Sequence, residues 1–126
     1  MPDSGLVVTQ LVEAYAARDE DAMRSALASD LTAYVTNAEG GVDRVDGREA
    51  YVQGLLALVA EELSVRVTQT VTVAPDSTLT MVEIRAERAG KTLHNFSAFL
   101  ARIENEQIVE LWMVEALPAY SAEFWQ

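Results

Sequence analysis

The spacing of apolar residues changes at Ser64, and this change constrains the fold more than any other feature of the sequence. Before Ser64, apolar residues recur every three or four positions, as is typical of amphipathic helices. After it, segments rich in β-branched and aromatic residues are separated by gaps of hairpin length, which predicts antiparallel neighbouring strands. Helices followed by a strand meander favour a single α+β domain, residues 1–126, with the helices on one side of a curved antiparallel sheet.

The helical part is expected to hold three helices and one strand. The first covers residues 4–18, and Asp19 can cap a short second helix. LTAYVT, residues 31–36, is predicted to be a strand, and the glycine-rich segment after it to form turns around a short pairing near residues 42–45. A long third helix is predicted from the helical spacing of five apolar residues: Val52, Leu55, Leu56, Val59 and Leu63.

Four strands are expected after Ser64, and a short tail follows Pro118. Their sequences are VRVTQTVTVA, TLTMVEIRAER, KTLHNFSAFLARI and QIVELWMVEA. In the tail, Tyr120, Phe124 and Trp125 can form one helical turn, which would cover the mouth of a cavity, contact a second subunit or pack against the chain's own core. We favour the last interpretation, because terminal aromatic residues commonly anchor a chain end.

Composition limits the classes of function. The chain has a net charge of −11, which repels phosphates and anionic lipids, so nucleic acid and membranes are poor partners. No cysteine and a single histidine argue against thiol chemistry and against cysteine- or histidine-based metal sites, and we expect no metal and no cofactor. The N-terminal sequence resembles no export signal, and we expect a cytoplasmic protein.

Three segments carry a resemblance to a known superfamily: LVEAYAARDEDAMRSALASDLTAYV, VDGREAYVQGLLAL and ENEQIVELWMVEALPAY. Together with the order of elements, they resemble the nuclear transport factor 2-like superfamily, which includes SnoaL-like polyketide cyclases, ketosteroid isomerases and limonene epoxide hydrolases. The resemblance implies a cone-shaped, cystatin-like roll with a cavity. It also places Leu11, Val35 and Phe99 where the isomerases carry their catalytic tyrosine, base and protonated acid. Apolar side chains at these positions argue against a steroid-type isomerisation.

Strand alternation then assigns residues to the cavity face, starting from Phe99. Asn95 shares that face and is either a ligand contact or a satisfied buried amide. On the last strand, the resemblance places Leu111, Met113 and Glu115 in the cavity. Apolar walls would raise the pKa of Glu115 and suit it to acid/base catalysis, whereas the alternative is a solvated or arginine-paired carboxylate. Tyr15, Tyr34, Asn37 and Tyr51 can supply further polar groups or be core residues, and the candidate binding residues are Tyr15, Val35, Asn37, Asn95, Phe99, Leu111 and Met113.

The single histidine, His94, is predicted to lie on the convex face of the sheet. His94 points away from the cavity if the strand has no bulge, so we expect a structural residue rather than a catalytic one. It shares this face with Phe96, Leu100, Trp112 and Val114, an apolar patch that predicts a partner. In the superfamily such faces pair as homodimers, which the resemblance implies here too.

Three functions follow as hypotheses. The first is proton-transfer chemistry of the cyclase or isomerase type on a small hydrophobic molecule, with Glu115 as acid/base. The second is non-catalytic ligand binding in the same cavity. The third is a protein-interaction module, which needs an apolar patch left exposed after dimerisation.

Overall fold

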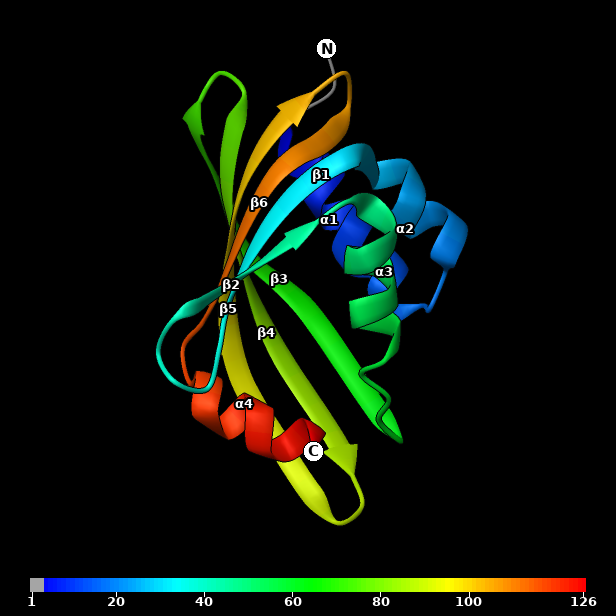
Figure 1. Cartoon of the computed structure of the whole chain (residues 1–126), viewed down its shortest axis with the longest axis vertical. Coiled ribbons are helices and arrows are strands. Elements are labelled where there is room, and N and C mark those ends of the chain that lie inside the picture. The colour runs from blue at the N-terminus through cyan, green and yellow to red at the C-terminus, as the bar shows by residue number, and fades with distance from the viewer. Residues whose placement is uncertain (1–3) are drawn as a thin grey trace.

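Four helices and six strands lie in the part of the chain that the computed structural model describes, residues 4–126 (Figure 1). The helices are α1 (Ser4–Ala16), α2 (Glu20–Ala26), α3 (Arg48–Leu56) and α4 (Pro118–Trp125). The strands are β1 (Leu27–Thr36), β2 (Val42–Asp46), β3 (Glu62–Ala74), β4 (Ser77–Arg88), β5 (Lys91–Glu104) and β6 (Gln107–Glu115). They form one curved sheet in the order β2-β1-β6-β5-β4-β3, which confirms the predicted α+β fold class.

The sheet is mixed rather than wholly antiparallel. Strands β3 to β6 form the predicted antiparallel meander, but β1 pairs in parallel with β6 and places Val35 beside Met113. A parallel pair needs a long connection between its strands, and here the chain between β1 and β6 contains α3 and the rest of the sheet. The base position and the last strand of the predicted cavity are therefore direct neighbours.

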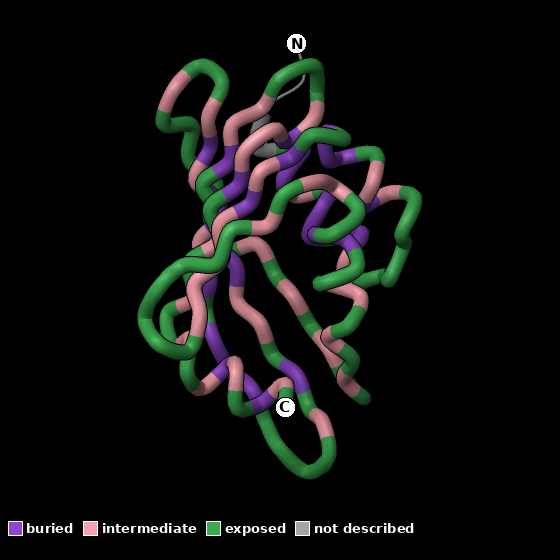
Figure 2. Tube along the Cα trace, viewed as in Figure 1, coloured by how far each residue is buried: buried purple, intermediate pink, exposed green. Residues whose placement is uncertain are grey.

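Helix α1 covers the concave face of the sheet, packing against β3, β4 and β5. Val8, Leu11 and Val12 lie on its buried side, at the spacing expected for an amphipathic helix. The buried residues in Figure 2 gather where the helices face the sheet, whereas the hairpin ends are exposed. Register shifts in β1, in β3 and near Arg102 mark irregularities that bend and twist strands.

The third helix is shorter than predicted. It ends at Leu56, Val59 is exposed in the following loop, and Leu63 belongs to β3, where it pairs with Ala86. The Arg18 guanidinium donates hydrogen bonds to the carbonyls of Leu56 (2.7 Å) and Leu58 (3.1 Å), which satisfies groups that the end of the helix leaves free. Pairing with β4 therefore takes the residues that would have continued the helix.

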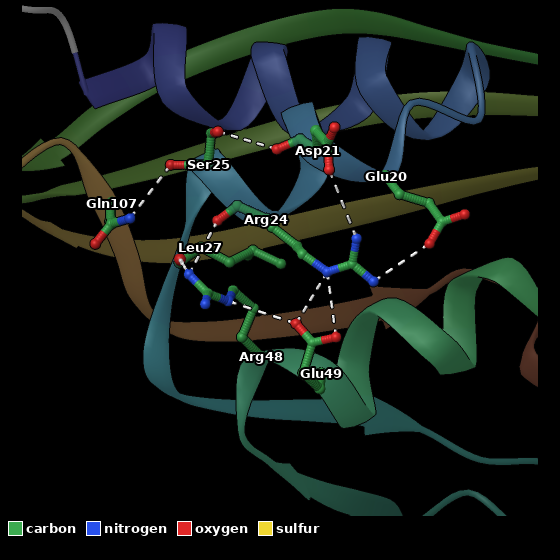
Figure 3. A network of polar contacts seen from close by, with 8 residues as sticks. All are labelled: Glu20, Asp21, Arg24, Ser25, Leu27, Arg48, Glu49 and Gln107. Atoms are coloured by element: carbon green, nitrogen blue, oxygen red, sulfur yellow. Dashed lines mark hydrogen bonds and ion pairs between the residues drawn. The ribbon is translucent and has the colours of Figure 1, made fainter.

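An ionic network joins α2 to α3 (Figure 3). The guanidinium of Arg24 contacts Glu20 at 3.2 Å and Glu49 at 3.0 Å, and Asp19 caps α2 as predicted by accepting a hydrogen bond from the backbone of Ala22. Arg48 donates to the carbonyls of Arg24 and Leu27 from the start of α3. This network fixes the two helices against each other.

Helix α4 packs against the far ends of β4 and β5. Phe124 is 2% exposed and forms a small second core with Ala86 and Leu93, so the tail packs against its own domain, as favoured from the sequence. The Tyr120 hydroxyl donates to the Thr92 carbonyl (2.6 Å) and accepts from the His94 backbone (3.0 Å). Among residues 4–126, no helix is both long and apolar enough to cross a membrane.

Candidate functional site

A cavity of about 360 Å³ lies between the concave face of the sheet and α1, α3 and α4. Its volume is at the small end of the range of roughly 300–1,000 Å³ typical of ligand pockets. Apolar side chains form most of its wall, chiefly leucine and valine together with Phe99 and Trp125. The polar residues come from separate elements: Tyr15, Thr36, Asn37, Asp43, Tyr51, Ser97, Glu115 and Ser121.

Glu115 is one of two carboxylates of this wall, with Asp43, and it stands at the last position of β6. Burial raises the pKa of its carboxyl group above the usual value, and a hydrogen bond with the Ser121 side chain opposes this in part. The Asn95 amide lies 3.4 Å from Oε2, and the backbone N–H of Glu115 donates to the Thr36 hydroxyl at 3.1 Å. Within residues 4–126, no lysine, arginine or histidine side chain forms a salt bridge with Glu115.

Two phenols stand at the helical side of the cavity. Burial raises the pKa of Tyr15, although the nearby Arg18 opposes it, and burial together with Tyr15 raises the pKa of Tyr51 further. Both hydroxyls therefore stay protonated and neutral at physiological pH. They can donate hydrogen bonds to an uncharged ligand.

Six of the predicted site residues line the cavity, and two do not. Tyr15, Val35, Asn37, Phe99, Met113 and Glu115 belong to its wall. Leu111 has no exposed surface and packs in the main core instead, because β6 runs from the core toward the cavity and Leu111 lies at the deeper position. Its predicted place in the cavity is corrected accordingly.

Asn95 is the second correction, because its side chain is used by the chain itself. Its Nδ2 donates to the Leu117 carbonyl at 3.1 Å, and its Oδ1 accepts from the backbone N–H groups of Phe96 (2.9 Å) and Leu117 (3.2 Å). It is 1% exposed and is absent from the cavity wall. Of the two readings left open by the sequence, the satisfied buried amide describes it.

Asn37 lines the cavity but its amide is also engaged. Its Oδ1 accepts from the backbone of Glu39 and Gly41, and its Nδ2 donates to Asp43 at 3.1 Å. These bonds shape the turn between β1 and β2, a common use of asparagine. Asn37 thus forms the cavity rim and holds Asp43 there.

Some wall residues were not among the sequence candidates. Ser97 follows the alternation from Phe99 and could have been chosen from it, and Tyr51 was considered as a polar group. Ser121 and Trp125 reach the cavity because α4 folds back over the sheet. For Trp125 this agrees with one of the alternatives considered for the tail, a turn that covers the cavity mouth, whereas Ser121 was not a candidate.

The convex face presents the predicted apolar patch. Phe96, Leu100, Trp112 and Val114 are between 37% and 48% exposed, and Trp112 stacks on Tyr34 with ring centroids 4.1 Å apart. His94 lies on this face and its Nε2 is 2.8 Å from Glu83. Glu83 also pairs with Arg66 and Arg85, and hydrogen bonds from Arg66 and His94 lower its pKa to about 2. His94 is therefore on the face opposite the cavity and is not among the residues of the cavity wall.

The three positions that correspond to the catalytic residues of the isomerases face the cavity. Leu11, Val35 and Phe99 all line it, and all are apolar. Within residues 4–126, no three histidine, aspartate or glutamate side chains are grouped so as to hold a metal ion. The chemistry available to the wall is thus that of two carboxyl groups, Asp43 and Glu115, and several neutral hydroxyls.

The family assignment comes from comparison with known proteins. A family model described as a SnoaL-like domain matches residues 8–111, which is most of the chain. The protein belongs to the SnoaL-like family. A comparison with curated protein sequences found no match.

Solved structures confirm the fold of this SnoaL-like domain. Bal32a, from a soil-derived mobile gene cassette, has a TM-score of 0.84 at 14% identity, with 98% of this chain and 96% of that chain covered. A candidate SnoaL-like polyketide cyclase from Jannaschia sp. CCS1 has a TM-score of 0.79 at 16% identity, with coverage of 96% and 90%. An LEH-like epoxide hydrolase from M. tuberculosis has a TM-score of 0.76 at 14% identity, with coverage of 96% and 88%. These likenesses establish the nuclear transport factor 2-like fold.

Proposed function

We propose that this SnoaL-like domain binds a small hydrophobic molecule in its cavity and transfers a proton to or from it through Glu115. The observation that carries the proposal is the desolvated carboxyl group of Glu115 in a largely apolar wall. A carboxyl group with a raised pKa can both accept and return a proton near neutral pH. Such a step serves cyclisation and isomerisation alike.

The elementary reaction is enolisation of a carbonyl compound. The Glu115 carboxylate removes a proton from the carbon beside the carbonyl, the C–H electron pair forms a C=C bond, and the carbonyl becomes an enolate. Return of the proton to the same or another carbon restores the carboxylate. The apolar wall favours this step because it excludes water from the carboxyl group.

Deuterium exchange tests the proposal without knowledge of the natural substrate. 2-Acetylnaphthalene in D₂O is followed by NMR for loss of its methyl protons. We expect the wild-type protein to catalyse exchange, and Glu115→Gln to abolish it while the ketone still binds. Glu110→Gln is the matched control, since Glu110 lies on the same strand and points to the other face.

Non-catalytic binding is the second candidate. It is favoured by the apolar residues Leu11, Val35 and Phe99, which leave the cavity without the isomerase catalytic set. Ketone binding with no exchange above the rate of the Glu115→Gln variant would select this function over catalysis.

We also propose that two copies pair through the convex face. Four half-exposed apolar residues cover it, and the Glu83 cluster beside them carries both signs of charge. A two-fold interface places the same surface on both subunits, so a patch with both signs can complement itself. His94 would then be an interface residue.

A further inference from the structure

Ser97 is a polar residue of the cavity wall, and the proposed proton transfer by Glu115 does not involve it. It lies on β5, is 3% exposed, and its Oγ has no hydrogen-bond partner among the described residues. Folded proteins pair the great majority of their buried polar atoms, so an unpaired hydroxyl in a cavity wall needs an explanation. A bound ligand supplies one.

The location separates Ser97 from the other unpaired groups. Within residues 4–126, the buried side-chain atoms without a partner are Arg48 Nε, Thr78 Oγ1, Thr80 Oγ1 and Ser97 Oγ. Of these four residues, Ser97 alone lines the cavity. A molecule in the cavity can therefore form a hydrogen bond with the Ser97 hydroxyl. The other three groups do not belong to the cavity wall.

The sheet register places Ser97 beside Glu115. The two residues are direct partners across β5 and β6. Side chains of directly opposed residues share one face, with Cβ atoms about 4.5–5.5 Å apart. A ligand atom bound to the Ser97 hydroxyl thus lies next to the carboxyl group that would move the proton.

The charges of the wall determine which ligand atom suits this position. The described lining residues include the acids Asp43 and Glu115 and no lysine, arginine or histidine. An anionic ligand would meet repulsion from both carboxylates and from the net charge of −11, with no cation to offset it. A neutral oxygen meets no such repulsion.

We infer that Ser97 binds the uncharged carbonyl oxygen of a neutral, largely apolar substrate and holds it beside Glu115. This inference rests on the proposed function and names its substrate class and a binding residue. The hydroxyl donates to the carbonyl, and the same bond stabilises the enolate oxygen when Glu115 removes the proton.

Paired ligands of equal shape test the role of Ser97. 2-Acetylnaphthalene and 2-isopropenylnaphthalene differ in C=O against C=CH₂, and their binding is measured by quenching of tryptophan fluorescence and by calorimetry. We expect Ser97→Ala to weaken ketone binding about tenfold, the loss of one hydrogen bond, and hydrocarbon binding by less than about twofold. Thr78→Val, which removes an unpaired hydroxyl outside the cavity, should change neither.

Stability supplies a second readout. Because the Ser97 hydroxyl has no partner within residues 4–126, we expect Ser97→Ala to leave the melting temperature unchanged or higher. Naphthalene-2-carboxylate should bind more weakly than the ketone. Tighter binding of the carboxylate would contradict the neutral substrate class.

The outcomes separate this inference from the proposed function. Equal effects of Ser97→Ala on ketone and hydrocarbon, or no effect on either, overturn the role of Ser97 alone. Failure of the wild-type protein to bind any of the three probes overturns the apolar ligand cavity and this inference with it. Selective loss of the ketone without deuterium exchange supports Ser97 and removes only the catalytic role of Glu115.

Discussion

At the scale of single residues, Asn95 and Glu115 are neighbouring polar groups that differ in how fully the protein satisfies their hydrogen bonds. The Asn95 amide is occupied by backbone groups of Phe96 and Leu117, whereas Glu115 has only a long contact to that amide and the Ser121 hydroxyl beside it. Asn95 is therefore committed to the fold. The carboxyl group of Glu115 can still form hydrogen bonds with a ligand.

The buried carboxyl group should make stability depend on pH. The pKa of Glu115 is raised above its ordinary value of 4.5, so its contribution to stability is fully present below the unfolded pKa and is lost as the pH rises through the folded pKa. We expect Glu115→Gln to melt close to the wild type at pH 4 and at a higher temperature at pH 8, measured by calorimetry. Glu110→Gln is the control, and a difference that stays constant over this range would contradict the burial argument.

Sequence alternation predicted the faces of the strands but not the position along them. The resemblance places Phe99, Met113 and Glu115 in the cavity, and all three line it, yet Leu111 shares their face and lies in the core. Periodicity does not predict where a curved sheet separates from the helices that cover it, because that separation depends on contacts between residues far apart in the sequence. The contribution of Ser121 to the wall was not predicted, for the same reason.

At the scale of elements, α3 depends on what lies at its two ends. Gly47 precedes it with φ of +92°, a conformation that side-chain-bearing residues rarely adopt, and Arg18 binds the carbonyls after it. The apolar spacing through Leu63 fits a longer helix, but the hairpin with β4 extends β3 back to Glu62. Local pattern predicted the helix, and strand pairing determined its end.

Two glycines of this region should respond oppositely to alanine. Gly47→Ala forces a Cβ into the positive-φ conformation and should lower the free energy of unfolding by about 1–2 kcal/mol. Gly54→Ala lies inside α3 with open space around the new Cβ and should raise it by about 0.5–1 kcal/mol. Urea denaturation measures both, and stabilisation by Gly47→Ala would refute the strain argument.

At the scale of the whole molecule, α1 and the cavity cover one face of the curved sheet, and none of the described helices covers the other. The convex patch should hold two copies together, although each carries a net charge of −11. Screening by salt weakens the repulsion between like charges. Association through apolar contacts is therefore expected to strengthen as salt is added.

Sedimentation velocity at micromolar concentration measures this association. We expect a wild-type dimer and a folded monomer for Trp112→Glu, which places a charge at the centre of the patch. Val42→Glu, a similarly exposed apolar position on the edge strand β2, is the control and should remain dimeric. A wild-type monomer at every salt concentration would rule out the convex-face pairing.

The family match does not include every residue of the cavity wall. The SnoaL-like match ends at residue 111, whereas Glu115, Ser121 and Trp125 of the cavity wall follow it. The last part of the chain therefore has two roles, because it supplies cavity-wall residues and also holds Phe124 in the second core with Ala86 and Leu93. We expect substitutions at Ser121 and Trp125 to change ligand preference, provided that Phe124 is kept.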